Sequence, residues 1–198
     1  RWAPHGQKRR QPHSLLRHAL SAQCMGLCHC PKNAMPAPDA TAANAPHLPT
    51  SQPRVVAWLG YGGLLPFVAL AAASVFDTER LAWWSAALIS YGAVILSFVG
   101  ALHWGFAMGL RAVSAAQRNA LYVWSVVPSL LAWPATLLGG TLGSVLLIAG
   151  FGLHYARDLR LARTADIPPW YLPLRLRLTA TACACLAVGA ISSVVTHG

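Results

Sequence analysis

The chain has 198 residues, of which 56% are hydrophobic and only 10% are charged. Soluble domains carry about 25% charged residues, so the composition excludes an ordinary soluble domain and indicates an integral membrane protein. A formal net charge of +10 is a feature of proteins that bind nucleic acid. We exclude nucleic acid as a partner because residues 55–198 are largely apolar, and membrane topology and anionic lipid explain the positive charge better.

Residues 1–54 form a basic extension that is rich in proline and alanine. The extension holds seven Lys and Arg residues and a single acidic residue, Asp39. Arg-rich, acidic-poor segments are typical of organelle transit peptides, so we predict an uncleaved presequence or a mature extension in the mitochondrial matrix. The segment has little core of its own, and we expect a partner surface to hold it.

Three cysteines, Cys24, Cys28 and Cys30, lie in this extension beside a histidine. Thiolates at such spacing can bind zinc, but structural zinc sites usually pair two C-x2–4-C units, and only one is present. We therefore predict unpaired thiols and no metal, with a local disulfide or a metal site at these three cysteines as the alternatives.

Five hydrophobic spans follow the extension. The longest apolar run, residues 81–110, contains no Lys, Arg, Asp or Glu, and a helix of roughly 20 residues is enough to cross a bilayer. The other spans are predicted at residues 55–76, 120–138 and 141–155, and from residue 174 or 178 to residue 196. They are separated by a charged turn at 77–80, a polar loop at 111–119, a glycine turn at 139–140 and a basic loop at 156–173. We therefore predict an all-α integral membrane domain, residues 55–198, with five transmembrane helices.

The basic residues predict the topology of these spans. With five spans, fourteen of the fifteen Lys and Arg residues fall on the side of the N-terminus, and Arg80 alone falls on the other. The positive-inside rule then places the N-terminus inside, in the matrix or cytoplasm, and the C-terminus outside.

Three segments carry a resemblance to a known family. WLGYGGLLPFVAL occupies residues 58–70, YGAVILSFVGALHWG occupies 91–105, and PPWYLPLRLRLT occupies 168–179. Together they resemble the transmembrane protein 69-like family, a domain-of-unknown-function family of bacterial and mitochondrial membrane proteins, over about residues 54–195. The resemblance implies a small five-span protein of an inner or plasma membrane. It implies no established catalytic activity, so it supplies no catalytic residues.

Tyr91, His103 and His154 are the polar candidates inside the predicted spans. Ionisable residues in a membrane are costly and mark functional positions. We expect the two histidines at similar depth near the basic side, because their helices run in the same direction. The preferred interpretation is hydrogen bonding across the bundle. A proton site, a quinone or lipid contact and a b-type haem are the alternatives.

A basic group near the membrane surface is predicted to contact lipid headgroups, cardiolipin included. Its members are Arg111, Arg157, Arg160, Arg163, Trp170, Arg175 and Arg177. The alternative is that these residues only fix the topology. Asp158, among them, is expected to pair with Arg157 or Arg111.

The run of small residues in the longest span predicts close helix packing. Its members are Gly92, Ala93, Gly100, Ala101 and Gly105. No phosphate-binding loop, nucleophile elbow or paired carboxylates occur in the sequence, so we predict no enzyme activity and no cofactor beyond bound phospholipid or cardiolipin.

We therefore predict a non-catalytic accessory (supernumerary) subunit of a multiprotein complex in the mitochondrial inner membrane, within the respiratory chain. Its expected partners are other membrane subunits and lipids, with no nucleic acid. The alternatives are a small transporter, a lipid- or quinone-binding protein, and a transient assembly factor.

Overall fold

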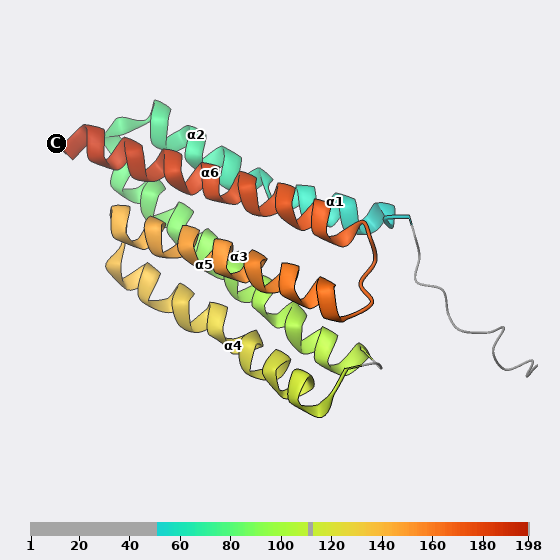
Figure 1. Ribbon diagram of the computed structural model, residues 1–198. Coiled ribbons are helices and arrows are strands. Elements are labelled where there is room, and N and C mark those ends of the chain that lie inside the picture. Colours follow the sequence, from blue (N-terminus) through green and yellow to red (C-terminus); the bar gives the residue numbers. More distant parts are fainter. Residues whose placement is uncertain (1–50, 111–112, 198) are drawn as a thin grey trace, which may run out of the picture. The chain divides into compact units, whose positions relative to one another are not determined.

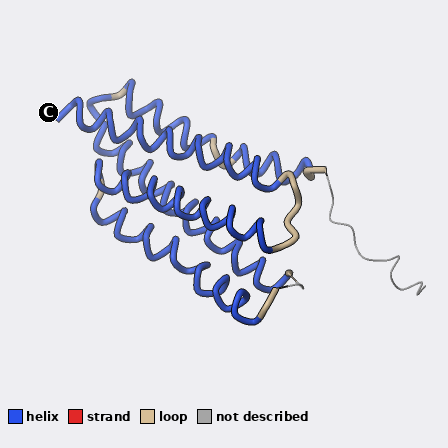
Figure 2. Tube along the Cα trace, in the orientation of Figure 1, coloured by secondary structure: helices blue, strands red, loops and turns tan. Residues whose placement is uncertain are grey.

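The computed structural model describes residues 51–110 and 113–197, and these residues form helices and loops with no strand (Figure 1, Figure 2). The elements in chain order are α1 (Arg54–Gly62), α2 (Leu65–Phe76), the short 3-10 helix η2 (Thr78–Arg80), α3 (Leu81–Gly109), α4 (Ala115–Leu138), α5 (Gly140–Thr164) and α6 (Tyr171–His197). The predicted all-α class is confirmed. Residues 1–50, which include the three cysteines of the extension, and Arg111 lie outside the described ranges.

Four helical segments in the described part of the chain are long and apolar enough to cross a membrane. They are Arg54–Phe76, Thr78–Gly109, Ala115–Leu138 and Tyr171–Thr196. Helix α5 is not among them, although its 25 residues run alongside the others (Figure 1). Its second half carries Arg157, Asp158, Arg160 and Arg163, which lower its hydropathy.

The structure corrects several predicted boundaries. Residues 156–164 are not a loop, because α5 continues to Thr164. The predicted polar loop at 111–119 is shorter, because α4 begins at Ala115. There, Ser114 and Gln117 form a capping box, in which each side chain bonds the backbone of the other. Helix α6 begins at Tyr171, earlier than predicted. In α4 and α5, polar or basic residues extend the helix beyond the apolar run that hydropathy detects, whereas α6 begins with Tyr171, Leu172 and Pro173.

The first span is broken where the proline predicts a kink. Helix α1 ends at Gly62, and α2 begins at Leu65 with Pro66 in its first turn. Proline cannot donate a backbone hydrogen bond, so carbonyl groups near the break lack helical partners. The hydroxyl of Tyr91 on α3 donates to the carbonyl oxygen of Gly63 at 2.8 Å. This bond holds the break against α3.

Small residues allow the helices to cross closely. A Cβ atom added at Gly100 of α3 would lie 2.9 Å from Pro128 Cγ and 3.0 Å from the Ser125 carbonyl of α4. At Gly150 of α5 it would lie 2.7 Å from Leu96. Gly105, by contrast, faces open space. The predicted packing role therefore holds for Gly100, while Gly105 makes no such contact within the described part of the chain.

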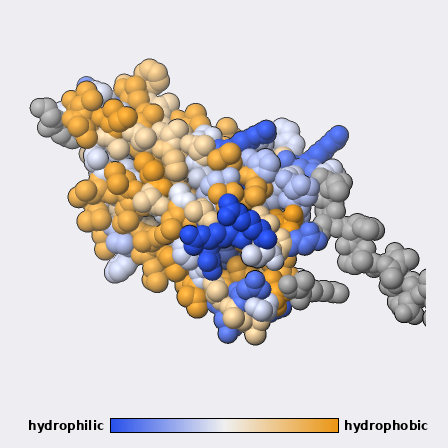
Figure 3. Space-filling view, in the orientation of Figure 1, coloured by the Kyte–Doolittle hydropathy of each residue, from blue (hydrophilic) through white to orange (hydrophobic). Residues whose placement is uncertain are grey.

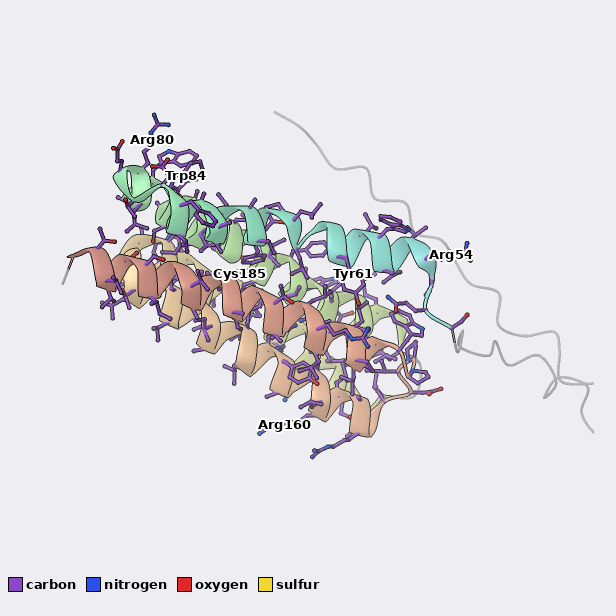
Figure 4. The ribbon with its side chains drawn as sticks, turned by 90° about the horizontal axis from the view of Figure 1, so that it is seen from above. Arg54, Tyr61, Arg80, Trp84, Arg160 and Cys185 are labelled. Carbon is purple, nitrogen blue, oxygen red and sulfur yellow. The ribbon has the colours of Figure 1, made fainter. Side chains whose placement is uncertain are left out.

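The two ends of the bundle differ in charge. Arg80 and Trp84 lie at one end and Arg54 at the other (Figure 4). The α3–α4 and α5–α6 connections share the end where α1 begins (Figure 1), so seven of the eight arginines that the structure describes belong to that half. These seven are Arg54, Arg118, Arg157, Arg160, Arg163, Arg175 and Arg177. Figure 3 shows hydrophilic residues gathered on the half away from the C-terminus, with apolar residues covering most of the rest of that face. We call this half the basic end.

Candidate functional site: a buried His–Asp–Arg cluster

Four buried polar side chains from three helices meet inside the bundle, toward its basic end. His103 comes from α3, His154 and Asp158 from α5, and Arg175 from α6. The first three are 0% exposed and Arg175 is 5% exposed. Buried ionisable groups of this kind are costly unless they are paired, so their convergence makes this His–Asp–Arg cluster the candidate site.

Asp158 is the centre of the cluster. Its Oδ2 accepts a hydrogen bond from Arg175 Nε at 3.0 Å. Its Oδ1 faces the histidines, at 3.6 Å from His103 Nε2 and 3.9 Å from His154 Nε2. Those two separations are too long for hydrogen bonds. The carboxylate is therefore hydrogen-bonded to Arg175 of α6 and lies beside the imidazoles of His103 and His154.

The local sequence explains how these groups meet. His154 and Asp158 are four residues apart on α5, so they lie on the same helix face. His103 follows Gly100 by three residues on α3, and its ring centroid lies 4.8 Å from that of His154. Arg175 lies in the second turn of α6, directly after the short α5–α6 connection. The close crossing of helices thus places three elements around one carboxylate.

The cluster is electrically neutral when Asp158 is ionised and both histidines are uncharged. Arg175 and ionised Asp158 neutralise each other, so a proton added to either histidine would place an uncompensated charge in the core. Several polar atoms of the cluster have no hydrogen-bond partner among residues 51–110 and 113–197: both nitrogens of His103, Nε2 of His154, Oδ1 of Asp158 and Nη2 of Arg175. Most buried polar atoms in proteins are hydrogen-bonded. The cluster therefore retains hydrogen-bonding capacity that the described part of the chain does not use.

Trp124 extends the cluster to α4. Its indole Nε1–H donates to His154 Nδ1 at 3.3 Å, and the two rings are nearly parallel at 18°. The guanidinium of Arg157 lies 5.3 Å from the Trp124 ring centroid, within cation–π range. Because Nδ1 accepts this bond, the proton of a neutral His154 is on Nε2, on the side of Asp158.

The cluster has the donor types of a metal site but not a favourable charge. One donor atom each from His103, His154 and Asp158 lies within 4.8 Å of the other two. However, Arg175 already binds the carboxylate, so a divalent cation there would face a buried guanidinium. A metal ligand also needs a free lone pair, and the Trp124 bond leaves the proton of His154 on Nε2. We therefore describe the cluster as a hydrogen-bonding centre.

The structure separates the three predicted intramembrane candidates. It brings His103 and His154 together, whereas Tyr91 bonds the carbonyl of Gly63 elsewhere. Tyr91 and His103 are twelve residues apart on α3, about 18 Å along the helix.

The expected pairing of Asp158 with Arg157 or Arg111 is wrong for Arg157, because Asp158 binds Arg175. The sequence reasoning also missed Trp124, for which spacing gives no signal. The spacing of four residues between His154 and Asp158 is the signal that could have placed Asp158 beside His154.

The predicted headgroup residues that the structure describes lie along the basic end. Arg157 and Arg160 line a surface pocket of about 200 Å³ with Gln117 and Thr164. Arg163 is exposed at the last turn of α5. Arg177 is also exposed, and its guanidinium donates to the Tyr61 hydroxyl at 3.4 Å. Trp170 is partly buried, and its ring centroid lies 6.5 Å from that of Tyr171. Arg175 does not face this pocket, because it is buried with Asp158.

Comparison with known proteins agrees with the helical membrane architecture. Residues 52–191 match the model of a family described as "Protein of unknown function (DUF3429)". Transmembrane protein 69 of Xenopus tropicalis is 35% identical over 125 residues, which are 62% of this chain and 48% of that protein. Transmembrane protein 69 of Mus musculus is 27% identical over 125 residues, which are 63% of this chain and 50% of that protein.

The chain spans about half the length of these curated relatives. No solved structure matches it. The family match covers all four candidate membrane spans in whole or in large part and every member of the His–Asp–Arg cluster. This chain belongs to the DUF3429 family of transmembrane protein 69-like membrane proteins.

Proposed function

We propose that this membrane protein is a non-catalytic accessory subunit of a multiprotein complex, in the mitochondrial inner membrane and within the respiratory chain. The main support for the proposal is that the other helices of the bundle bury little of the first span. Only 11% of the most apolar stretch of Arg54–Phe76 is buried, against 44% for Thr78–Gly109. Helix α1 has no buried residue, and Trp58 is 80% exposed. A span that its own bundle leaves exposed offers a contact surface to a neighbouring subunit.

The interior of the bundle supports a structural role. The Asp158–Arg175 pair joins α5 to α6, and the Tyr91–Gly63 bond joins α3 to the break between α1 and α2. Buried polar contacts of this kind can fix one arrangement of helices. A bundle joined by such contacts, with a first span that it covers poorly, suits a supporting subunit.

The basic end supports a second part of the proposal, contact with anionic lipid. Arg157 and Arg160 lie at one pocket, and Arg54, Arg163 and Arg177 are exposed at the same end. Clustered arginines at a membrane surface attract anionic headgroups. In the proposed topology this end faces the matrix, with five spans in which α5 crosses beside the four candidate helices.

Site-specific crosslinking tests the proposed partner face. A photoreactive amino acid at position 58 is expected to give one defined protein adduct in native membranes. The same amino acid at position 126 on α4, where Val126 is 52% exposed, serves as the comparison and is expected to label lipid. Adducts at position 58 that contain lipid alone would contradict the proposal.

A further inference from the structure

The pocket at the basic end lies between the start of α4 and the end of α5, and it has a volume of about 200 Å³. Its polar lining residues are Gln117, Arg157, Arg160 and Thr164. None of its described lining residues is acidic. Asp158, which stands between the two arginines in the sequence, is buried with Arg175 inside the bundle. The pocket therefore carries positive charge without a carboxylate of its own.

The polar side chains of the pocket have donors to offer. Arg157 and Arg160 form no ion pair within the part of the chain that the structure describes. Gln117 accepts a hydrogen bond from the Ser114 backbone through its Oε1, so its NH2 group remains for another acceptor. Thr164, by contrast, donates its hydroxyl to carbonyl groups of its own helix. Two guanidinium groups and one amide form a set of donors that suits an oxyanion.

The two arginines are close enough to repel each other. Arg157 and Arg160 are three residues apart on α5, so they are neighbours on one helix face, where like charges are unfavourable. The Arg157 guanidinium lies 5.3 Å from the centroid of the Trp124 ring. This cation–π contact orients the guanidinium but leaves its charge in place. An oxyanion between the two guanidinium groups would offset their repulsion.

The depth of the pocket places it at the level of lipid phosphates. Gln117 belongs to the first turn of α4, and Thr164 is the last residue of α5. Helix α4 has 24 residues and is therefore about 36 Å long, whereas the apolar core of a bilayer is about 30 Å thick. When α4 spans the bilayer, its first turn lies among the headgroups.

The apolar side of the pocket favours a lipid over a soluble phosphate ester. Ala120 and Leu121 of α4 and Leu161 of α5 also line it. Leu153 precedes Arg157 by one turn on the same face of α5 and is 49% exposed. An acyl chain attached to a phosphate in the pocket would cover this apolar surface, whereas a soluble ester would leave it open.

We propose that this pocket binds the phosphate of one anionic phospholipid, with Arg157, Arg160 and the Gln117 amide donating to its oxygens and an acyl chain lying over Leu153. The head of the lipid carries no ammonium group, because a positive group would be repelled by both arginines. The inference rests on the proposed contact between the basic end and anionic lipid. It adds that one lipid is held at one place, whereas simple attraction would spread lipids over the whole end.

Native mass spectrometry of the purified, delipidated full chain in detergent micelles tests the site by counting bound ligands. The probes are dioleoylphosphatidylglycerol, dioleoylphosphatidylcholine and glycerol 3-phosphate. We expect one molecule of phosphatidylglycerol to bind about 10-fold more tightly than phosphatidylcholine. Equal affinity for the two lipids would overturn the proposal. Displacement of phosphatidylglycerol by an equal concentration of glycerol 3-phosphate would show a site for a soluble phosphate ester and would overturn it too.

Two pairs of variants locate the site. Arg160→Gln removes one pocket charge and should weaken phosphatidylglycerol binding about 5-fold. Its control, Arg163→Gln, removes an exposed charge from the same helix that does not line the pocket, and it should bind as wild type. Ala120→Phe fills the pocket and should weaken binding roughly 10-fold. Its control, Ala115→Phe, is the same change at an exposed position outside the pocket and should have no effect.

These variants also separate the pocket from general attraction to the basic end. Equal losses in Arg160→Gln and Arg163→Gln would overturn the pocket and leave the proposed contact with anionic lipid standing. Wild-type binding by Arg160→Gln and Ala120→Phe would overturn the pocket as well. Equal affinity of the wild-type chain for both lipids would contradict the proposed contact itself. Circular dichroism of each variant checks that the helices are retained.

Discussion

At the scale of single residues, Asp158 joins elements that lie far apart in the sequence. Its carboxylate bonds Arg175 on α6 and lies beside His103 on α3 and His154 on its own helix. Removing one member of a buried ion pair leaves the other charge uncompensated, which costs more than the pair itself contributes. The stability of the bundle should therefore depend on the pair as a unit.

Asp158→Asn should lower the free energy of unfolding by about 3–5 kcal/mol, because Arg175 remains charged and buried. The measurement is denaturant unfolding in detergent micelles. Asp166→Asn, at an exposed carboxylate, is the control and should change stability by less than about 0.5 kcal/mol. The double variant Asp158→Leu with Arg175→Met should recover much of the loss. A double variant as unstable as Asp158→Asn would contradict the explanation.

Tyr91→Phe should destabilise the bundle by about 1 kcal/mol, because the Gly63 carbonyl loses its hydrogen bond at the α1–α2 break. Hydrogen exchange at the break should increase at the same time. Tyr122→Phe, at a partly buried tyrosine that packs on Trp104, is the matched change and should leave exchange at the break unaltered. Unchanged exchange in Tyr91→Phe would show that the bond does not hold the break.

At the scale of elements, glycine decides how closely α3 and α4 cross. Gly100 touches Pro128 and Ser125 of α4, whereas Gly105 on the same helix faces open space. The two positions therefore provide a test of packing within one helix.

Gly100→Ala should cost about 1–3 kcal/mol, because the added methyl group would overlap the α4 backbone. Gly105→Ala should be neutral or stabilising by up to about 1 kcal/mol, since alanine favours helix and meets nothing there. Thermal unfolding monitored by circular dichroism measures both. Equal effects at the two positions would mean that helix propensity, not packing, determines them.

Hydropathy predicted the helices well but not their ends. Apolar runs located the cores of α3, α4 and α6, and Pro66 located the break between α1 and α2. The continuation of α5 to Thr164 could not be found in this way, because arginines follow the apolar run and read as a loop. The Asp158–Arg175 pair is a contact between separate helices, so its partner choice depends on packing that a single sequence does not encode locally.

At the scale of the whole molecule, the separation of charge predicts orientation. Arg54 and most other described arginines lie at the basic end, and Arg80 lies at the opposite end (Figure 4). With α5 crossing, the number of spans is odd and the two termini lie on opposite sides of the membrane.

Cysteine accessibility in oriented membrane vesicles tests this orientation. On a chain with its native cysteines replaced, Ser51→Cys should be labelled only from the inner side, and Glu79→Cys and Thr196→Cys only from the outer side. Labelling of Ser51→Cys and Thr196→Cys from the same side would contradict the five-span arrangement.

The most direct test of the accessory-subunit proposal is native electrophoresis of mitochondrial membranes solubilised in digitonin, with the tagged full chain followed by immunoblot and its co-migrating chains identified by mass spectrometry. We expect the chain to migrate with a respiratory complex in near-stoichiometric amount. Migration of all the chain as a free monomer would contradict it, and a trace amount on immature complexes alone would indicate a transient assembly factor instead.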